Sequence, residues 1–514
     1  MKHTNMTPIR LSAIVLACVV ATGCASISPL AASVDTLQNI NNQDRAKNAE
    51  AVEPIIAPLS MEAALARALK YNLERRSRLM EEALAMGQLS VTKYEMLPRV
   101  MANAGYSSKD KARFTYSSTH PSETPNKDNT ASTSADRDHS TTELGLSWSL
   151  LDFGLGYYNS KQQADRVLVA SEKRRKATHL LMQDVRLAYW RAASAQLLRD
   201  DVAKTIKLAE EALADSRKVE AERVRNPLEP LRFQRQLLEN LRLLESINQE
   251  LSSAQVDLAT LINAPLNQPI VLAATESLAT TDPLSSINMD QLEEVALINN
   301  ADLREQHYNA RIARDETRRT MMRLFPNITF SYDYKYDSDN YLLHNRWNET
   351  GVQLSFNLMN IFTGASQMKL TEAGVALAEH RRMTTQMSVL AQVHLARLEA
   401  MNARNQFLRA DAIYDTDKKI AEIMRNRASA QAQSKLDMVS SETASILSLL
   451  RRYQALAQVQ VAENRMLATL GLEPYMGDTN LISLKELTTS LTHAQAPWEQ
   501  LRAGKALPKT APGW

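Results

Sequence analysis

The sequence has little of what sheets, tight turns and loop-rich domains need. Its 514 residues include 13 glycines, 17 prolines and 5% aromatic residues, whereas 23% are charged. Few helix breakers and many charged residues favour long helices with solvated faces over a mainly β fold. Lysine and arginine, 60 in total, nearly balance the 58 aspartates and glutamates. We therefore expect no nucleic-acid partner, because no excess of positive charge would attract one.

Cysteine is almost absent. Cys18 and Cys24 are the only two, so the chain beyond them has no disulfides and no thiolate metal sites. The nine histidines form no metal-ligand spacing such as His-Glu-x-x-His. The stretch Asp152-Phe153-Gly154 spells the metal-binding motif of kinases, but the glycine-rich loop and catalytic loop that kinases require are missing. We therefore expect no enzymatic activity, no metal site and no cofactor.

Beyond the N-terminus, no hydrophobic run reaches the roughly 20 apolar residues of a transmembrane helix. The N-terminus itself has basic residues at Lys2 and Arg10 and then an apolar run from Leu11 to Ala21. Such a run is too short to span a bilayer as a helix and is typical of an export signal. Any deeper contact with a membrane must then be made by β-strands.

The apolar run ends in Ala21-Thr22-Gly23-Cys24, which resembles the lipobox of bacterial lipoproteins. That resemblance implies cleavage of residues 1–23, lipidation of Cys24, and residues 24–57 as a polar tether. Ala25 and Ser26 follow the cysteine, so no aspartate indicates retention at the inner membrane. The alternative is an ordinary secretory signal that contains a chance cysteine.

An internal repeat organises the chain. Ala68-Leu69-Lys70-Tyr71-Asn72 returns as Ala296-Leu297-Ile298-Asn299-Asn300, and Pro98 returns as Pro326 at the same displacement. Later in the two copies, corresponding motifs are about 20 residues closer together in the sequence than these first ones. The first copy must therefore contain a longer loop. We predict a unit of about 200 residues used twice, at 58–275 and 289–474, followed by a tail at 475–514.

Four segments alternate apolar and polar residues, two in each copy of the repeat. They predict strands near residues 98–109, 141–151, 326–337 and 350–359. Segments of roughly ten residues with this period are typical of transmembrane strands that face lipid on one side and a wet lumen on the other. A soluble antiparallel sheet gives the same alternation, but the export signal favours the membrane. The predicted lipid-facing residues are Val100, Tyr106, Leu144, Leu146, Trp148, Leu150, Ile328, Phe330, Tyr332, Tyr334, Val352, Leu354, Phe356 and Leu358.

Four strands cannot close a barrel. Open strand edges in lipid leave backbone groups unpaired, which costs several kcal/mol for each group. We therefore predict that further copies of the same chain complete the barrel.

Long helices fill the rest of each repeat. No proline occurs between about Gly156 and Val224, and a helix of roughly 70 residues would be on the order of 100 Å long. The returning segments carry seven-residue repeats typical of coiled-coil seams. Their predicted seam residues are Leu237, Leu241, Leu244, Leu251 and Leu258 in the first copy, and Leu436, Val439, Thr443, Ile446, Leu450, Tyr453 and Ala457 in the second.

The seams turn at corresponding places in the two copies. Asn226 suits a helix cap, Pro227 suits the first helical position and Glu229 completes a capping box, while Ser434 and Asp437 offer the same arrangement. These hairpin tips, farthest from the strands, are where we expect a partner to dock or a gate to close. The predicted tip residues are Arg225, Asn226, Pro227, Leu228, Glu229, Ser434, Lys435, Leu436 and Asp437.

Together these features resemble the TolC-like outer-membrane efflux factors. The matching motifs are the lipobox at Cys24, the Ala-Leu-x-x-Asn openings, Pro98 and Pro326, the stretch from Leu146 to Gly154, and the Leu-Ala-Thr-Leu helix ends. The resemblance covers roughly residues 58–474. It implies a mostly α fold with a small transmembrane β part. It also implies a homotrimer with a twelve-stranded β-barrel in outer-membrane lipid and a long α-helical barrel in the periplasm. Its implied partners are a periplasmic adaptor, which docks at the tips, and an inner-membrane pump.

The competing hypothesis is a periplasmic coiled-coil adaptor or scaffold lipoprotein without a pore. Such a protein would share the long hairpins and the lipid anchor, but it would not need two pairs of alternating strands at corresponding points of a repeat. Between efflux of small molecules and secretion of proteins the sequence leaves the choice open.

Overall fold

A computed structural model describes residues 31–116, 131–221, 228–266, 268–273, 287–429, 435–472 and 482–493. The chain forms two compact units, residues 1–54 and 55–514. The described part of the first unit is helix α2 (Val34–Ala51), which begins where Ser33 Oγ accepts a hydrogen bond from the backbone of Thr36. This helix lies within the segment expected to be a polar tether. Among the described residues, no helix is both long enough and apolar enough to cross a bilayer.

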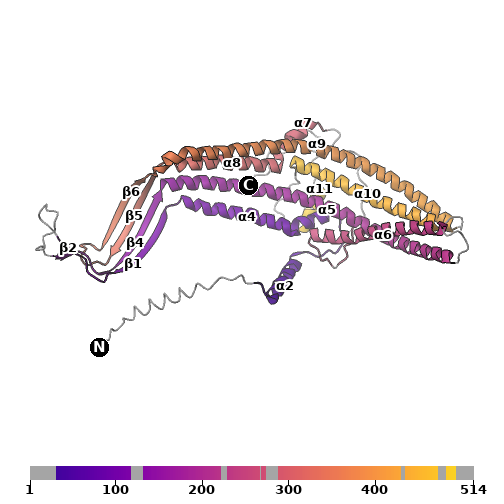
Figure 1. Ribbon diagram of the computed structural model, residues 1–514, viewed down its shortest axis with the longest axis horizontal. Coiled ribbons are helices and arrows are strands. Elements are labelled where there is room, and N and C mark those ends of the chain that lie inside the picture. Colours follow the sequence, from indigo (N-terminus) through magenta and orange to yellow (C-terminus); the bar gives the residue numbers. More distant parts are fainter. Residues whose placement is uncertain are drawn as a thin grey trace, which may run out of the picture. The chain divides into compact units, whose positions relative to one another are not determined.

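The second unit contains the same series of elements twice (Figure 1). The first series is α3 (Met61–Tyr71), α4 (Leu73–Lys93), β1 (Arg99–Ser108), β4 (Asp138–Ser149), α5 (Leu150–Ala221) and α6 (Leu228–Leu261). The second is α7 (Met289–Asn299), α8 (Ala301–Met322), β5 (Asn327–Asp337), β6 (Arg346–Ser355), α9 (Met359–Ser429) and α10 (Lys435–Leu470). The predicted duplication and the mostly α fold class are therefore confirmed.

Among the described residues of this unit, four further elements stand outside the duplicated series. They are the short 3-10 turn η1 (Tyr94–Met96), the small hairpin of β2 (Phe114–Tyr116) and β3 (Ala131–Thr133), and helix α11 (Leu484–His493). Helix α11 packs against α3, and its Leu487 is completely buried in the main core. No pattern in the predicted tail at 475–514 indicated this helix.

The four long strands form one antiparallel sheet in the order β1-β4-β5-β6. Strands β4 and β5 belong to different repeats and pair directly, with Leu146 opposite Tyr332 and Leu144 opposite Tyr334. The sheet therefore joins the two halves of the chain at its centre and leaves β1 and β6 as its edges.

The second and fourth strands begin and end earlier than predicted, which corrects three assignments. Leu150 is the first residue of α5, and Phe356 and Leu358 follow the end of β6, so none of the three lies on a strand. The cause is helix capping by polar side chains at the junctions. Ser149 Oγ accepts a hydrogen bond from Asp152 N (3.0 Å), and Asn357 Oδ1 accepts one from Met359 N (3.1 Å). These bonds start the helices and take the chain out of the ladder.

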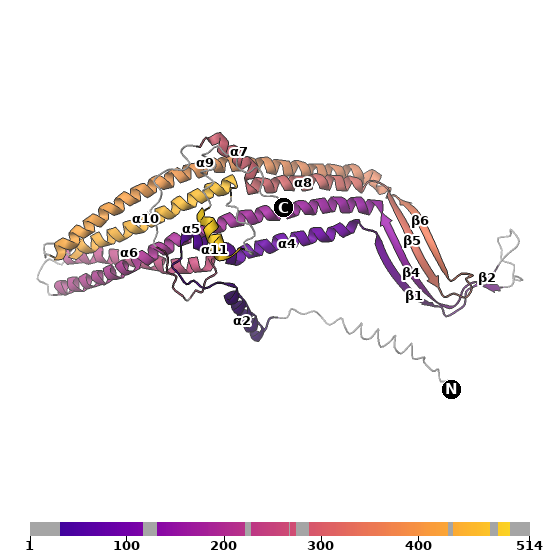
Figure 2. The same cartoon turned by 180° about the vertical axis from the view of Figure 1, so that it is seen from behind.

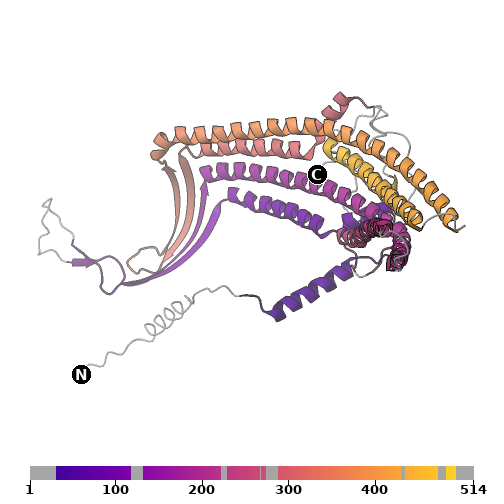
Figure 3. The same ribbon diagram turned by 45° about the vertical axis from the view of Figure 1, so that its right-hand side comes forward.

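The helices lie side by side in a layer that continues from one end of the sheet (Figures 1 and 2). Next to the sheet the order is α4, α5, α8 and α9, and farther away α6 and α10 take the places of α4 and α8 beside the two long helices. At 72 and 71 residues, α5 and α9 run through both zones, and α5 has the predicted length. The view in Figure 3 shows the strands extending from the sheet-proximal ends of these helices.

The coiled-coil seams pack as the seven-residue repeats predict wherever the structure describes their side chains, which it does not for Leu436. In α6 the buried seam residues are Leu237, Leu241, Leu244, Leu251 and Leu258, and in α10 they are Val439, Thr443, Ile446, Leu450 and Ala457. Tyr453 packs against the same core from a partly buried position. The far half of the helical layer is therefore held mainly by apolar side chains.

Candidate functional site

The two faces of the four-stranded sheet differ sharply in chemistry. Residues directly opposite each other in an antiparallel pair point to the same face, so the register fixes which side chains share a side. One face carries Val100, Ala102, Ala104, Tyr106, Thr142, Leu144, Leu146, Trp148, Ile328, Phe330, Tyr332, Tyr334, Tyr336, Val352 and Leu354, together with the polar or charged residues Ser108, Asp138, Ser140, Arg346, Asn348 and Thr350. We call it the apolar face. The structure thus brings eleven of the predicted lipid-facing residues onto one surface: Val100, Tyr106, Leu144, Leu146, Trp148, Ile328, Phe330, Tyr332, Tyr334, Val352 and Leu354.

This apolar face is open to its surroundings. Val100 is 66% exposed, Tyr106 73% and Val352 71%, so none of the described helices covers them. An exposed apolar surface that extends over four strands indicates contact with a partner or a membrane, because exposing so much apolar surface to water is energetically unfavourable.

The opposite face is polar and charged, and we call it the polar face. Lys335 Nζ lies 2.7 Å from Glu349 Oε2 and 3.7 Å from Glu143 Oε1, so one lysine bridges carboxylates on both neighbouring strands. Gly145 lies opposite Asp333, where an added Cβ would come within 2.5 Å of the Asp333 carboxylate. Glycine therefore makes room for a charged neighbour. The alternation predicted a polar side, but the bridge across three strands depends on long-range pairing that sequence reasoning missed.

Aromatic residues mark the junction between the strands and the helices. The Trp148 ring meets Phe153 edge to face at 5.9 Å, and its Nε1 donates a hydrogen bond to the carbonyl of Met96 (3.4 Å). Next to Phe153, Asp152 forms an ion pair with Arg99 (3.1 Å). The Asp-Phe-Gly stretch that resembles a kinase motif thus fastens the start of α5 to the sheet.

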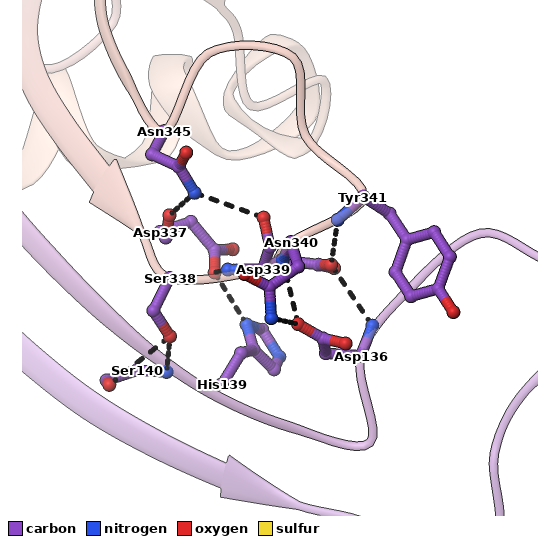
Figure 4. Close-up of polar contacts among 9 residues, drawn as sticks. All are labelled: Asp136, His139, Ser140, Asp337, Ser338, Asp339, Asn340, Tyr341 and Asn345. Carbon is purple, nitrogen blue, oxygen red and sulfur yellow. Dashed lines mark hydrogen bonds and ion pairs between the residues drawn. The ribbon is translucent and has the colours of Figure 1, made fainter.

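At the opposite end of the sheet, side chains extend the β4–β5 junction past the ladder (Figure 4). Ser140 N donates to Ser338 Oγ (2.8 Å), and the two serine Oγ atoms are 3.4 Å apart. Beyond them, Asp136 Oδ2 accepts hydrogen bonds from both the backbone N (2.7 Å) and the side-chain Nδ2 (2.9 Å) of Asn340. The two repeats are therefore tied together at their strand ends.

The turn between β5 and β6 is held by further carboxylate and amide groups in the same cluster. Asp339 Oδ1 accepts from the backbone N of Asp136 (3.1 Å) and of Tyr341 (3.0 Å), while Asn345 Nδ2 donates to the Asp337 carbonyl (2.7 Å). His139 Nδ1 lies 2.8 Å from Asp337 Oδ1. We call residues 136–140 and 337–345 the end clamp. The end clamp contains none of the predicted site residues. Its two segments are far apart in the sequence, and no local pattern indicates that they lie next to each other.

Helix α9 carries a second uncovered apolar surface along its length. Phe362 is 76% exposed, Leu370 74% and Met387 68%. The other exposed large apolar residues of α9 are Met359, Ile361, Leu377, Met383, Leu395, Leu398, Met401, Leu408, Ile413, Ile420 and Ile423. Helix α9 lies at the side of the helical layer (Figure 1), so this stripe is available to another molecule.

Near the far ends of the hairpins, neighbouring side chains of α10 contact the first repeat. Val439 of α10 is completely buried against a small cluster of α5 and α6 residues, namely Ala209, Ala212, Leu213, Leu237 and Leu241. Beside it, Asn240 Nδ2 donates to Ser440 Oγ (3.3 Å). Within the second hairpin, Arg425 pairs with Glu442 (2.6 Å). Each hairpin is thus extensively packed, whereas the described link between α6 and α10 at this level is small.

The predicted tip residues are only partly described. Leu228 begins α6, Glu229 follows it, and Lys435, Leu436 and Asp437 form the first turn of α10. Leu228 is 48% exposed and Asp437 is also exposed. Arg225, Asn226, Pro227 and Ser434 lie outside the described residues, as does Cys24.

A cleft of about 460 Å³ lies where α4, α5 and α6 approach one another. Its wall includes Glu74, Lys173, Lys176 and Asp184. Burial raises the pKa of Asp184, and the nearby negative charge of Glu74 raises it further. The wall of this cleft thus mixes exposed positive and negative side chains.

Comparison with solved structures identifies the fold. The CmeC outer membrane channel of Campylobacter jejuni superposes with a TM-score of 0.63 at 12% identity, over 84% of this chain and 89% of that chain. The outer membrane protein VceC of Vibrio cholerae gives 0.56 at 13% identity, over 80% and 96%. The open state of the MtrE outer membrane channel of Neisseria gonorrhoeae gives 0.54 at 16% identity, over 80% and 89%. Neither a family model nor a curated protein sequence matches the chain. Likeness at these identities establishes the fold, and the predicted TolC-like fold is confirmed.

Proposed function

We propose that this chain is one subunit of an outer-membrane channel. It would serve as the passive exit duct of a tripartite efflux or secretion system that spans the outer membrane and the periplasm. The observation that carries the proposal is the open four-stranded sheet with its exposed apolar face and its charged polar face. An apolar outer surface and a charged inner surface are what a water-filled barrel in lipid requires. The structural likeness to outer membrane channels supports the same role.

Self-association follows from the free edges of this sheet. In lipid, the outer edges of β1 and β6 must find partners for their backbone N–H and C=O groups. Pairing β6 of one copy with β1 of the next satisfies both edges, and three copies would give a closed barrel of twelve strands. The exposed stripe on α9 would then pack against the next copy, so that the helices close into a duct as well. We therefore propose a homotrimer.

The ends of the molecule are assigned by the same proposal. The sheet would lie in outer-membrane lipid, with an acyl anchor at Cys24, and the helices would extend into the periplasm. The hairpin tips would meet a periplasmic adaptor that connects the duct to an inner-membrane pump. The residues proposed for that contact are those predicted from the sequence, Arg225 to Glu229 and Ser434 to Asp437.

The alternative, a periplasmic adaptor or scaffold lipoprotein without a pore, does not explain the sheet. A scaffold would gain nothing from an exposed apolar face backed by a row of charges, and that face would promote aggregation in water. The helical hairpins alone would suit either protein.

The test is the oligomer mass of the detergent-extracted protein together with its single-channel conductance in a planar bilayer. We expect a trimer that gives discrete conductance steps. A monomer that never conducts, even after truncation of its hairpin tips, would refute the channel and favour the scaffold.

A further inference from the structure

The apolar face of the sheet carries charge only at the end farthest from the helices. All but two of its described residues are uncharged, and its neutral polar members include Asn348 and Thr350 on β6. The two exceptions are Asp138, which lies opposite Ser108, and Arg346, which lies opposite Tyr336. Both charges therefore lie at the outer rim of this face.

These two charged residues differ in whether they have an ionic partner. Asp138 Oδ2 lies 3.7 Å from the guanidinium of Arg137. Arg346 is exposed and has no carboxylate partner among the described residues. Its guanidinium lies over the Tyr336 ring, with its central carbon 5.6 Å from the ring centroid. The ring holds the cation in place by a cation–π contact and leaves its N–H groups free to donate.

We propose that Arg346 and Tyr336 form a binding site for the phosphate of a lipid headgroup in the outer leaflet. This inference rests on the proposed function, because it places the apolar face in lipid. On that orientation Arg346 lies at the outer end of β6, beyond Val352, Thr350 and Asn348, at the depth of the headgroups. Exposed Tyr106 lies at the same end of β1, and aromatic residues are typical of this interface.

The chemistry of the two residues fits a phosphate better than other lipid groups. A guanidinium donates two parallel hydrogen bonds to phosphate oxygens, which a neutral side chain cannot do. The arginine stem covers apolar surface while its charged end reaches the headgroups. Tyr336 adds a phenol at the same depth, and phenol rings favour the boundary between hydrocarbon and water.

The test is native mass spectrometry of the full-length protein in a neutral maltoside detergent, titrated with phosphatidylglycerol or with diacylglycerol, which lacks the phosphate. We expect the wild-type trimer to bind phosphatidylglycerol in preference to diacylglycerol. Arg346→Gln should weaken phosphatidylglycerol binding about ten-fold, the loss expected for one charge-assisted contact. Arg346→Lys should retain most of the binding, and Tyr336→Leu should give an intermediate loss.

Lys335→Gln is the matched control, because it removes a positive charge from the neighbouring residue of β5 on the polar face. We expect it to bind phosphatidylglycerol as the wild type does. Unchanged binding in Arg346→Gln, or a loss in Lys335→Gln instead, would overturn this inference. Absence of a trimer or of conductance in the wild type would instead refute the proposed function.

Discussion

Asn72 and Asn300 occupy corresponding positions in the two repeats and make the same two hydrogen bonds. Asn72 Oδ1 accepts from Arg75 N (3.0 Å), and its Nδ2 donates to the carbonyl of Leu261 (3.0 Å). Asn300 Oδ1 accepts from Leu303 N (3.1 Å), and its Nδ2 donates to the carbonyl of Thr469 (2.9 Å). Each asparagine therefore caps the start of one helix and holds the end of another, which closes its repeat. This explains the asparagine in the Ala-Leu-x-x-Asn openings.

Replacing Asn300 should destabilise the second repeat measurably. Asn300 is only 4% exposed, so Asn300→Ala removes a helix cap and leaves the Thr469 carbonyl without this donor. We expect a loss of about 1–3 kcal/mol in the free energy of unfolding. Asn300→Ser keeps a capping oxygen and loses the donated bond without burying a charge, so its loss should be smaller. Denaturant unfolding in detergent measures both, and equal stability of all three proteins would contradict this role.

Tyr189 should resist alkaline titration. Burial is the main cause that raises its pKa to about 12, with the negative charge of Glu62 as a further cause, and its hydroxyl donates to the Leu59 carbonyl (3.1 Å). Because the folded pKa lies above the unfolded value of 10.0, the stabilising contribution is complete below pH 10 and is lost as pH rises through about 12. Tyr189→Phe should remove this pH-dependent loss and cost about 1 kcal/mol at neutral pH. Stability curves of both proteins between neutral and high pH test this, and parallel curves would count against it.

The assignment of the two sheet faces can be tested on neighbouring residues of β6. Val352 lies on the apolar face opposite Phe330, whereas Gln353 lies on the polar face opposite Thr329. Val352→Lys should destabilise the protein in lipid vesicles by up to about 2–4 kcal/mol, because it places a charge in hydrocarbon. Gln353→Lys should change stability little. Similar losses in both variants, measured by urea unfolding from vesicles, would mean that this face does not meet lipid.

Val439 should hold the second hairpin against the first. Val439→Ala removes two methyl groups from a completely buried site, for an expected loss of about 1–2 kcal/mol. Under the proposed function, loosening this contact should also raise single-channel conductance. Val256→Ala, which truncates a valine that is 46% exposed on α6, is the matched control and should change neither quantity. Unaltered conductance of the Val439 variant would show that this link does not restrict the duct.

The end clamp can be locked covalently. The Oγ atoms of Ser140 and Ser338 are 3.4 Å apart, close enough for a disulfide after small adjustments. Oxidised Ser140→Cys/Ser338→Cys protein should restore the stability that Asp136→Asn removes, and reduction should abolish the rescue. Hydrogen exchange of the outer ends of β4 and β5 measures the effect. Failure of the disulfide to form would show that these strand ends are not adjacent.

Local patterns predicted the parts of the fold that depend on near neighbours in the sequence. The seven-residue repeats identified buried residues such as Leu244 and Ile446, because a helix face is set by residues three and four apart. The alternation identified the apolar side of each strand for the same kind of reason. The strand ends were wrong at Leu150, Phe356 and Leu358, because single polar caps at Ser149 and Asn357 overrode the continuing apolar pattern.

By itself the sequence determined the long helices, the four strands and the duplication, since each depends on periodic or repeated residues along the chain. The TolC-like fold came from the resemblance of its motifs to that family. Only the tertiary structure decided which groups meet across the two repeats. The pairing of β4 with β5, the contact of Val439 with the first hairpin and the hydrogen bonds between Asp136 and Asn340 all join residues far apart in the sequence. These contacts arise from the packing of one repeat against the other, and periodic patterns between near neighbours in the sequence do not specify that packing.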